Sequence, residues 1–431
     1  STVMTRLLSL LLCLLPLAVM AQQQTTLSDG SQSWNDGTVT VAPDGTATFR
    51  YRNPTAKKVW LDCSHLSKKR NMKRDVDCWT LKLDKLSAEL YNYRFLTSKK
   101  QALPDSCGKG VMRDVEKYYY YFIVPGDTVK YLFDRDVPHG RVEYVWYPST
   151  LNGMSQRRMA VYLPHGYDTD SLSRYPVLYL LHGSGGDETS WCDLGRAQQI
   201  FDNMIADGQA KPFIAVMPNG NVELDAAPGE SPWMQKEPTA NNVTSMTGMI
   251  ERAFPHEVVR FVDRCYRTHA DKSHRAIAGL SLGGLHTVFI TLNNPDMFDY
   301  VGLFSAQTTN MLDDRRLLKI NRAQHNAKRL KQAWGLLFNF VPSATIYEEK
   351  LGAIDIYAHT DEKLARQFQS PPKVYYIAIG QHDRLMYFNN MFRKKLDAGR
   401  YPYEYRQTPG AHSWDNWRHY LIEFLPKIFD R

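Results

Sequence analysis

The chain has 431 residues, of which 43% are hydrophobic and 23% are charged. This balance is typical of globular proteins and excludes a disordered or fibrous chain, and the length suits two or three domains. The formal net charge of +8 is spread along the chain, apart from a basic cluster at residues 68–74. No nucleic-acid-binding module accompanies this cluster, so we interpret it as a solvated loop and expect no nucleic-acid partner.

The first element along the chain is an apolar segment that predicts export. Arg6 precedes the apolar run 7–20, and small residues stand at the positions that signal peptidase reads before a cut after Ala21. The run is shorter than the roughly 20 residues that a membrane span needs. Cys13 lacks the small preceding residue of a lipoprotein signal. We expect residues 1–21 to be a cleavable signal peptide and the protein to be secreted or periplasmic, without a membrane span.

Five cysteines follow the predicted signal peptide, at positions 63, 78, 107, 192 and 265. An odd number cannot all pair. A bridge between Cys63 and Cys78 is one option, and five free thiols are the other, so the pairing stays open. Because no C-x-x-C or H-E-x-x-H spacing occurs, we predict no metal site.

Residues 37–135 are predicted to be β-structure. Short alternating segments, many of them aromatic, are separated by turn residues every 10 to 20 positions, as in a β-sandwich. The predicted strands are 38–41, 47–51, 58–61, 78–83, 90–95 and 118–124. We place a β-sandwich domain at 22–139.

From residue 140 the pattern changes to that of an α/β domain with a mainly parallel sheet. The run 177–181 is continuously apolar, as expected for a strand covered on both faces. Predicted strands are 158–163, 177–181, 213–217, 274–278, 300–304, 374–378 and 403–406. Predicted helices are 195–206, 250–266, 285–293, 361–368, 387–398 and 414–429. A basic, helical-looking stretch at 315–334 has no assigned place on this sheet.

A G-x-S-x-G motif at residues 279–283 lies between a predicted strand and a predicted helix. In this context the motif is a nucleophile elbow, whose tight turn presents Ser281 above the sheet edge. The start of the following helix offers free amide groups to an oxyanion. We therefore predict that Ser281 is a catalytic nucleophile.

The sequence also predicts the groups that would assist Ser281. A glycine-rich turn at 182–186 follows a strand, so an amide at Gly183 or Ser184 is expected to complete an oxyanion hole with the amide of Leu282. His412 and Asp383 follow two later strands and are predicted to be the base and its orienting carboxylate. Other acidic residues of this half compete with Asp383 for that role: Asp355, Asp361 and Asp397.

These motifs resemble those of the esterase D-type family, and more narrowly the feruloyl and acetylxylan esterases of carbohydrate esterase family 1. The likeness rests on His182–Trp191, Met217–Gly220, Arg275–Gly284 and Gly410–Arg418. It implies an α/β-hydrolase fold at 140–431, a Ser281–His412–Asp383 triad and no cofactor. Residues 127–149 resemble the joint with an N-terminal early-set domain, an immunoglobulin-like sandwich, which implies a possible glycan-binding module. Residues 306–370 match poorly.

Within this class, a feruloyl ester is the preferred substrate because three tryptophans could form flat walls for a phenolic ring. They are Trp191, Trp233 and Trp414, and the alternative is that they belong to the core. Three alternative functions use the same scaffold: hydrolysis of acetylxylan, hydrolysis of a siderophore ester, and acyl transfer to a sugar. A non-catalytic glycan-binding protein is a further alternative. The sequence leaves the oligomeric state undetermined.

Overall fold

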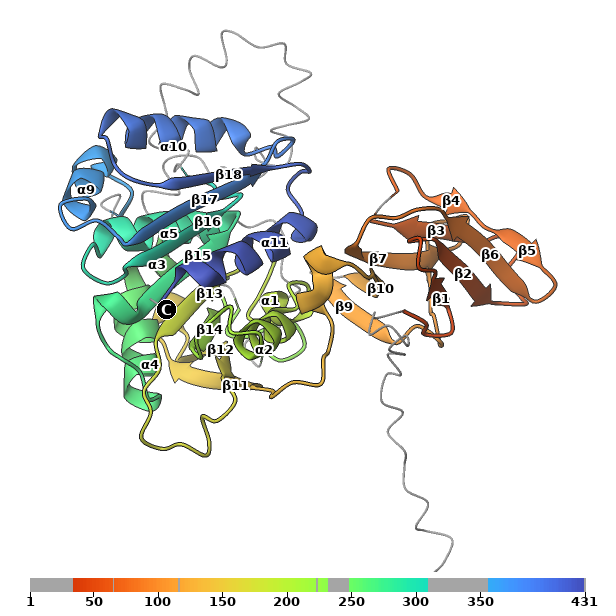
Figure 1. Ribbon diagram of the computed structural model, residues 1–431, viewed down its shortest axis with the longest axis horizontal. Helices are drawn as coiled ribbons and strands as arrows, with labels where there is room; N and C mark the ends of the chain where they lie inside the picture. Colours follow the sequence, from red (N-terminus) through yellow and green to blue (C-terminus); the bar gives the residue numbers. More distant parts are fainter. Residues whose placement is uncertain are drawn as a thin grey trace, which may run out of the picture. The chain divides into compact units, whose positions relative to one another are not determined.

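The computed structural model describes residues 34–64, 66–114, 117–221, 224–231, 248–308 and 356–429 (Figure 1). The predicted signal peptide, Trp233, Asp355 and the basic stretch 315–334 lie outside these residues. Two compact units are present: one extends to Met112 and includes Tyr119–Lys130, and the other comprises Arg113–Tyr118 and Tyr131–Arg431. The main change of unit therefore lies between Lys130 and Tyr131, earlier in the chain than the predicted boundary at residue 140.

The N-terminal unit consists of two antiparallel sheets. In β2 every second residue is buried, and its Phe49 packs on Tyr93 and Phe122 of the other sheet, with ring centroids 5.3 and 5.5 Å apart. The first sheet contains β1 (Val39–Val41), β2 (Ala47–Arg52), β6 (Cys78–Leu83) and β5 (Lys73–Asp75). The second contains β4 (Arg70–Asn71), β3 (Trp60–Cys63), β7 (Glu89–Leu96), β10 (Lys117–Val124), β9 (Gly110–Asp114) and β8 (Ala102–Leu103).

The structure differs from the interpretation of the basic cluster as a loop, and it decides between the two alternatives for the cysteines. The basic cluster 68–74 is not a plain loop, because part of it forms the exposed strands β4 and β5. Cys63 and Cys78 lie in different sheets, and none of the five cysteines of the described residues forms a disulfide.

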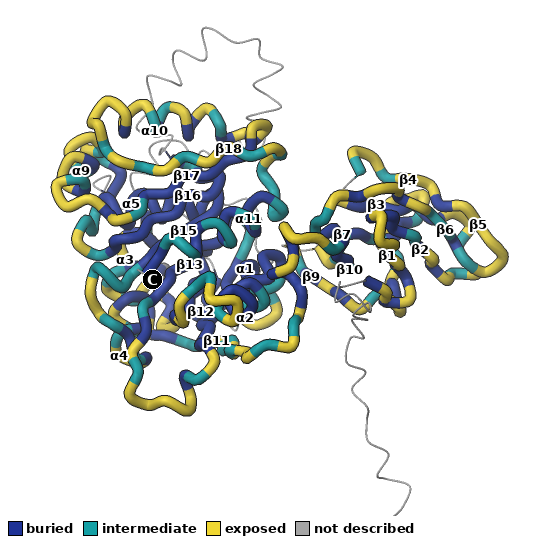
Figure 2. Tube along the Cα trace, in the orientation of Figure 1, coloured by how far each residue is buried: buried dark blue, intermediate teal, exposed yellow. Residues whose placement is uncertain are grey.

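The second unit is built on an eight-stranded sheet in the order β11-β12-β14-β13-β15-β16-β17-β18. The first two strands run antiparallel to their neighbours and the other six are mutually parallel. The strands are β11 (Arg141–Pro148), β12 (Gln156–Leu163), β13 (Val177–Leu181), β14 (Ile214–Pro218), β15 (Arg275–Leu280), β16 (Tyr300–Phe304), β17 (Val374–Gly380) and β18 (Glu404–Thr408). Figure 2 shows the central strands fully buried, as their continuous apolar sequences predicted.

Helices cover both faces of this sheet (Figure 1). One face carries α3 (Met249–Phe254), α4 (Arg260–Cys265), α5 (Leu282–Asn293), α9 (Thr360–Gln367) and α10 (Met386–Ala398). The other carries α1 (Ser190–Asp193), α2 (Ala197–Ala206) and α11 (Trp414–Phe424). No helix of the described residues is long and apolar enough to cross a membrane.

The predicted helix 250–266 is not one regular helix. A π-helical turn, Pro255–Val259, separates α3 from α4. Proline has no amide hydrogen and cannot make the regular i→i−4 bond, which favours a local widening of the helix at this point. The predicted helix 195–206 corresponds to α2, which begins at Ala197, and the short helix α1 precedes the predicted range.

Candidate active site

Ser281 lies in the sharp turn between β15 and α5. Its φ of 52° and ψ of −114° are rarely adopted by residues with a side chain, so the turn is strained. The glycines of the motif make the turn possible, because a Cβ on Gly279 would collide with the carbonyl of Gly283, and a Cβ on Gly283 with the carbonyl of His182. The turn leaves Ser281 8% exposed at the carboxyl edge of the parallel strands.

The structure brings His412 to Ser281 across 131 positions of sequence. The His412 Nε2 atom is 2.9 Å from the Ser281 Oγ atom. His412 stands in the loop between β18 and α11, and its ring packs edge-on against Trp417 with 4.9 Å between centroids. This contact helps to hold the imidazole in place over the hydroxyl.

Asp383 completes the line from the opposite side of the imidazole. Its two carboxylate oxygens are 3.0 and 2.9 Å from the His412 Nδ1 atom. A carboxylate only accepts hydrogen bonds, so Nδ1 carries the proton and Nε2 is free to accept the proton of Ser281. Asp383 is itself held by the amide of Leu385, which donates to Oδ1 at 2.8 Å.

The electrostatics of the pair keep the base neutral and the carboxylate charged. Burial lowers the pKa of His412 below its ordinary value of 6.5, although the hydrogen bond from its ring to Asp383 opposes this shift. Burial raises the pKa of Asp383, but its hydrogen bonds with His412 and with the Leu385 amide outweigh burial and leave that pKa lowered. Near neutral pH the site therefore holds an uncharged imidazole that can take up a proton.

Esterase activity is expected to fall as the pH decreases through the pKa of His412, because imidazolium cannot accept the Ser281 proton. Since that pKa is lowered from 6.5, the acid midpoint of kcat/KM should lie below pH 6.5. A profile of kcat/KM against pH with a soluble ester checks this. An acid midpoint above 6.5 would contradict it.

Both segments predicted to supply oxyanion amides border Ser281. Leu282 is the first residue of α5, where amide groups have no partner within the helix. Gly183 follows β13, and a Cβ placed on it would lie 3.3 Å from the Cβ of Ser281. The glycine-rich turn 182–186 and the helix start therefore meet beside the hydroxyl.

The three tryptophans predicted to line a substrate pocket have different positions. Trp191 is only 1% exposed, and its Nε1 atom donates to the Leu181 carbonyl at 3.1 Å, so its ring belongs to the core and has no free face. This corrects the prediction for Trp191. Trp414 is half-buried and packs edge-on against Trp191 and Trp417. Trp233 lies outside the described residues.

Replacing Trp191 by alanine is expected to lower the free energy of unfolding by about 3–5 kcal/mol, as for other large buried side chains. The KM of the folded enzyme for a small ester should change little, because the ring does not face the site. Denaturant titration and steady-state kinetics measure both quantities, and Trp191→Phe is the milder variant. Unchanged stability together with a raised KM would restore the lining role.

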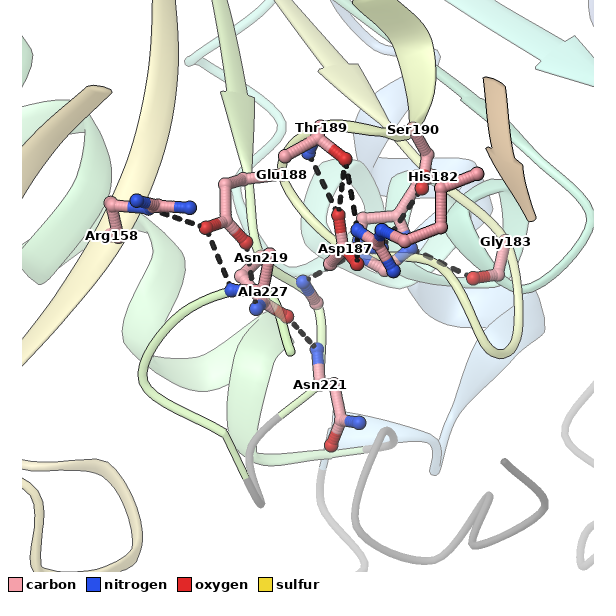
Figure 3. A network of polar contacts seen from close by, with 12 residues as sticks. Arg158, His182, Gly183, Asp187, Glu188, Thr189, Ser190, Asn219, Asn221 and Ala227 are labelled. Atoms are coloured by element: carbon pink, nitrogen blue, oxygen red, sulfur yellow. Dashed lines mark hydrogen bonds and ion pairs between the residues drawn. The ribbon is translucent and has the colours of Figure 1, made fainter. Parts of the chain in front are cut away.

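Sequence reasoning missed several residues around the site. His182, Glu188 and Asn219 are buried and form a polar network behind the turn 182–186 (Figure 3). They stood within motifs already quoted for the family resemblance, but nothing in the sequence distinguished their roles. No group of three or more potential metal ligands occurs in the part of the chain that the structure describes.

Comparisons with known proteins give a consistent result. The model of the family described as "Putative esterase" matches residues 152–428. The Endo-1,4-beta-xylanase/feruloyl esterase of Xylanibacter ruminicola is 40% identical over 182 residues, which are 41% of this chain and 23% of that protein. This chain thus spans less than a quarter of that relative.

Solved structures share the fold at low sequence identity. The enterobactin esterase FES of Shigella flexneri superposes with a TM-score of 0.56 at 14% identity, covering 88% of this chain and 92% of FES. A ferulic acid esterase superposes with a TM-score of 0.50 at 23% identity, covering 68% of this chain and 98% of its own.

Proposed function

This chain belongs to the Esterase family, and we propose that it is an exported serine esterase that removes feruloyl groups from plant cell-wall polysaccharide. The continuous line of hydrogen bonds from Ser281 through His412 to Asp383 supports the proposal that the chain is a serine esterase. The substrate rests on the similarity to a protein named as a xylanase and feruloyl esterase. Export rests on the apolar segment 7–20.

The proposed reaction has two steps. Ser281 Oγ attacks the ester carbonyl while His412 Nε2 takes its proton, and His412 then gives that proton to the departing sugar oxygen. Water, deprotonated by His412, then attacks the acyl-enzyme. The bond between the acyl carbon and Ser281 Oγ breaks, the acid is released, and His412 returns its proton to Oγ. The amide of Leu282 and one amide of residues 183–184 stabilise the oxyanion formed in each step.

Product analysis tests the substrate directly. The protein is incubated with feruloylated arabinoxylan and with acetylxylan, with Ser281→Ala as the blank, and released ferulate and acetate are quantified. Faster release of ferulate supports the proposal. Faster release of acetate favours an acetylxylan esterase, and formation of a new sugar ester favours acyl transfer. If neither acid is released, the protein is a glycan-binding protein or acts on another ester, such as that of a siderophore.

Among the described residues, Trp414 is the candidate for a wall beside the phenolic ring, and Trp233 stays a prediction. Trp414→Ala should raise the KM for methyl ferulate about 2- to 10-fold, the effect of losing one aromatic stack worth roughly 0.5–1.5 kcal/mol. The KM for p-nitrophenyl acetate, whose acyl group is not aromatic, should change less. Equal effects on both substrates would show that Trp414 acts only through packing.

A second function, binding of acidic polysaccharide by the N-terminal unit, is favoured by one observation. The Nζ atoms of Lys58 and Lys69 each lie 4.9 Å from the centroid of the Trp60 ring. Neither lysine has a carboxylate partner among the described residues. Two like charges held over one ring repel each other, and an anionic ligand would relieve this repulsion.

Affinity electrophoresis of the full-length protein in gels containing polygalacturonate or neutral arabinoxylan tests this second function. We expect retardation only in the acidic gel, and its loss in the double variant Lys58→Ala/Lys69→Ala. Lys99→Ala/Lys100→Ala, which removes two exposed lysines elsewhere in the unit, is the matched control. Equal retardation of both double variants would refute a specific surface.

A further inference from the structure

A buried carboxylate joins two loops at the carboxyl edge of the sheet. Glu188 is fully buried and accepts hydrogen bonds from three groups: Arg158 Nε at 2.6 Å, Asn219 Nδ2 at 2.9 Å and the amide of Ala227 at 2.8 Å (Figure 3). Its partners come from β12 and from the segment after β14. The turn that begins at Asn219 is therefore fixed against the loop that follows β13.

This fixed turn holds the ring of His182. The amide of Gly220 donates to His182 Nε2 at 2.8 Å, so Nε2 is an acceptor and the ring proton must be on Nδ1. Nδ1 lies 2.8 Å from the carbonyl oxygen of Gly183 and donates to it. Both ring nitrogens are thus used, and only the neutral imidazole satisfies both bonds.

The environment of His182 favours this neutral form. The side chain is 3% exposed, and burial lowers its pKa to about 4. Its charged and titratable neighbours are Asp187, Arg157 and His286. The ring is therefore a permanent hydrogen-bonding support at neutral pH rather than a proton carrier.

The carbonyl of Gly183 receives a second bond, from the amide of Gly186 at 3.1 Å, so the peptide between residues 183 and 184 has a fixed orientation. In a planar trans peptide the carbonyl and the following amide point in opposite directions. The amide of Ser184 must therefore face away from His182. It makes no hydrogen bond with the described protein groups, and Gly183 lies beside Ser281.

We propose that His182 is a positioning residue for the oxyanion hole: its neutral ring holds the Gly183 carbonyl so that the Ser184 amide is aimed at the oxyanion. Glu188 acts behind it by fixing the turn that supplies the Gly220 amide. The inference rests on the proposed esterase function and chooses Ser184 over Gly183, which the sequence left open.

The test compares His182→Ala with His182→Gln on p-nitrophenyl acetate. Loss of one whole oxyanion donor lowers kcat about 10²–10³-fold, so a misaligned donor in His182→Ala should lower kcat about 10- to 100-fold with little change in KM. Glutamine is neutral and can both donate and accept, so it should recover much of the loss. Rates are expressed per active site, titrated with a fluorophosphonate, which removes any effect of misfolded protein.

A second readout separates positioning from general loss of structure. Sulfur accepts hydrogen bonds more weakly than oxygen, so the rate ratio between an ester and its thionoester reports the oxyanion contact. The ratio should fall in His182→Ala and stay near wild type in His182→Gln. It should also stay near wild type in His274→Gln, a control that changes the histidine just before β15, at the end of that strand opposite Ser281. If alanine prevents folding, His182→Asn, too short to reach both partners, replaces it.

An unchanged kcat and ratio in the folded alanine or asparagine variant would overturn the inference, as would a glutamine variant as impaired as alanine. These outcomes differ from failure of the proposed function. That failure would appear as activity retained by Ser281→Ala, and it is measured first. The choice of p-nitrophenyl acetate also makes the result independent of the natural acyl group.

Discussion

Replacing Ser281 by alanine is expected to lower kcat on p-nitrophenyl acetate by about 10⁴- to 10⁶-fold, as in a comparable triad in which the nucleophile alone was removed. The physical reason is that no acyl-enzyme can form without the Oγ atom, which lies 2.9 Å from the base. The oxyanion amides and the binding surface remain, so a small residual rate above that of water should persist.

The Ser281 experiment needs a folding control and a matched serine. Circular dichroism and the thermal midpoint establish that Ser281→Ala folds. Ser273→Ala changes a partly exposed serine near the opposite end of β15 and should keep full activity. If Ser281→Ala folds and keeps more than about a tenth of the activity, another nucleophile performs the reaction.

Asp383→Asn is expected to lower kcat about 10⁴-fold, the effect of the equivalent change in a serine protease triad. Both carboxylate oxygens face His412 Nδ1, at 3.0 and 2.9 Å, and select the tautomer with the proton on that nitrogen. An asparagine amide can donate to Nδ1 instead, which would leave the proton on Nε2 and block the Ser281 hydroxyl. Steady-state kinetics at pH 8 measures the loss.

Two other carboxylates provide matched controls for Asp383→Asn. Asp361 forms an ion pair with Lys395 at 2.9 Å, and Asp397 accepts a hydrogen bond from the Tyr403 hydroxyl at 2.8 Å. Neither contacts His412, so Asp361→Asn and Asp397→Asn should leave kcat within about 2-fold. If kcat falls as much in either control as in Asp383→Asn, the decrease reflects lost stability of the protein and not selection of the His412 tautomer.

The parallel core of the sheet was predictable because its strands are covered on both faces. A strand in that position must be apolar along its whole length, as β13 and β16 are. The edge strand β11 was not predicted among the strands, since its half-exposed residues include Arg141 and Glu143 and give a weak periodic signal. The exposed strands β4 and β5 were missed for the same reason.

Sequence alone determined which residue types were present and in what order: a serine in a strand–turn–helix motif, then an acidic residue, then a histidine. The sequence favoured Asp383 as the orienting carboxylate, and the tertiary structure shows that this residue faces the imidazole while Asp361 and Asp397 contact other partners. Only the tertiary structure decided that Trp191 is core while Trp414 is half-buried. The reason is physical. A motif reports local backbone geometry, whereas burial and side-chain contacts depend on segments that meet only when the chain is folded.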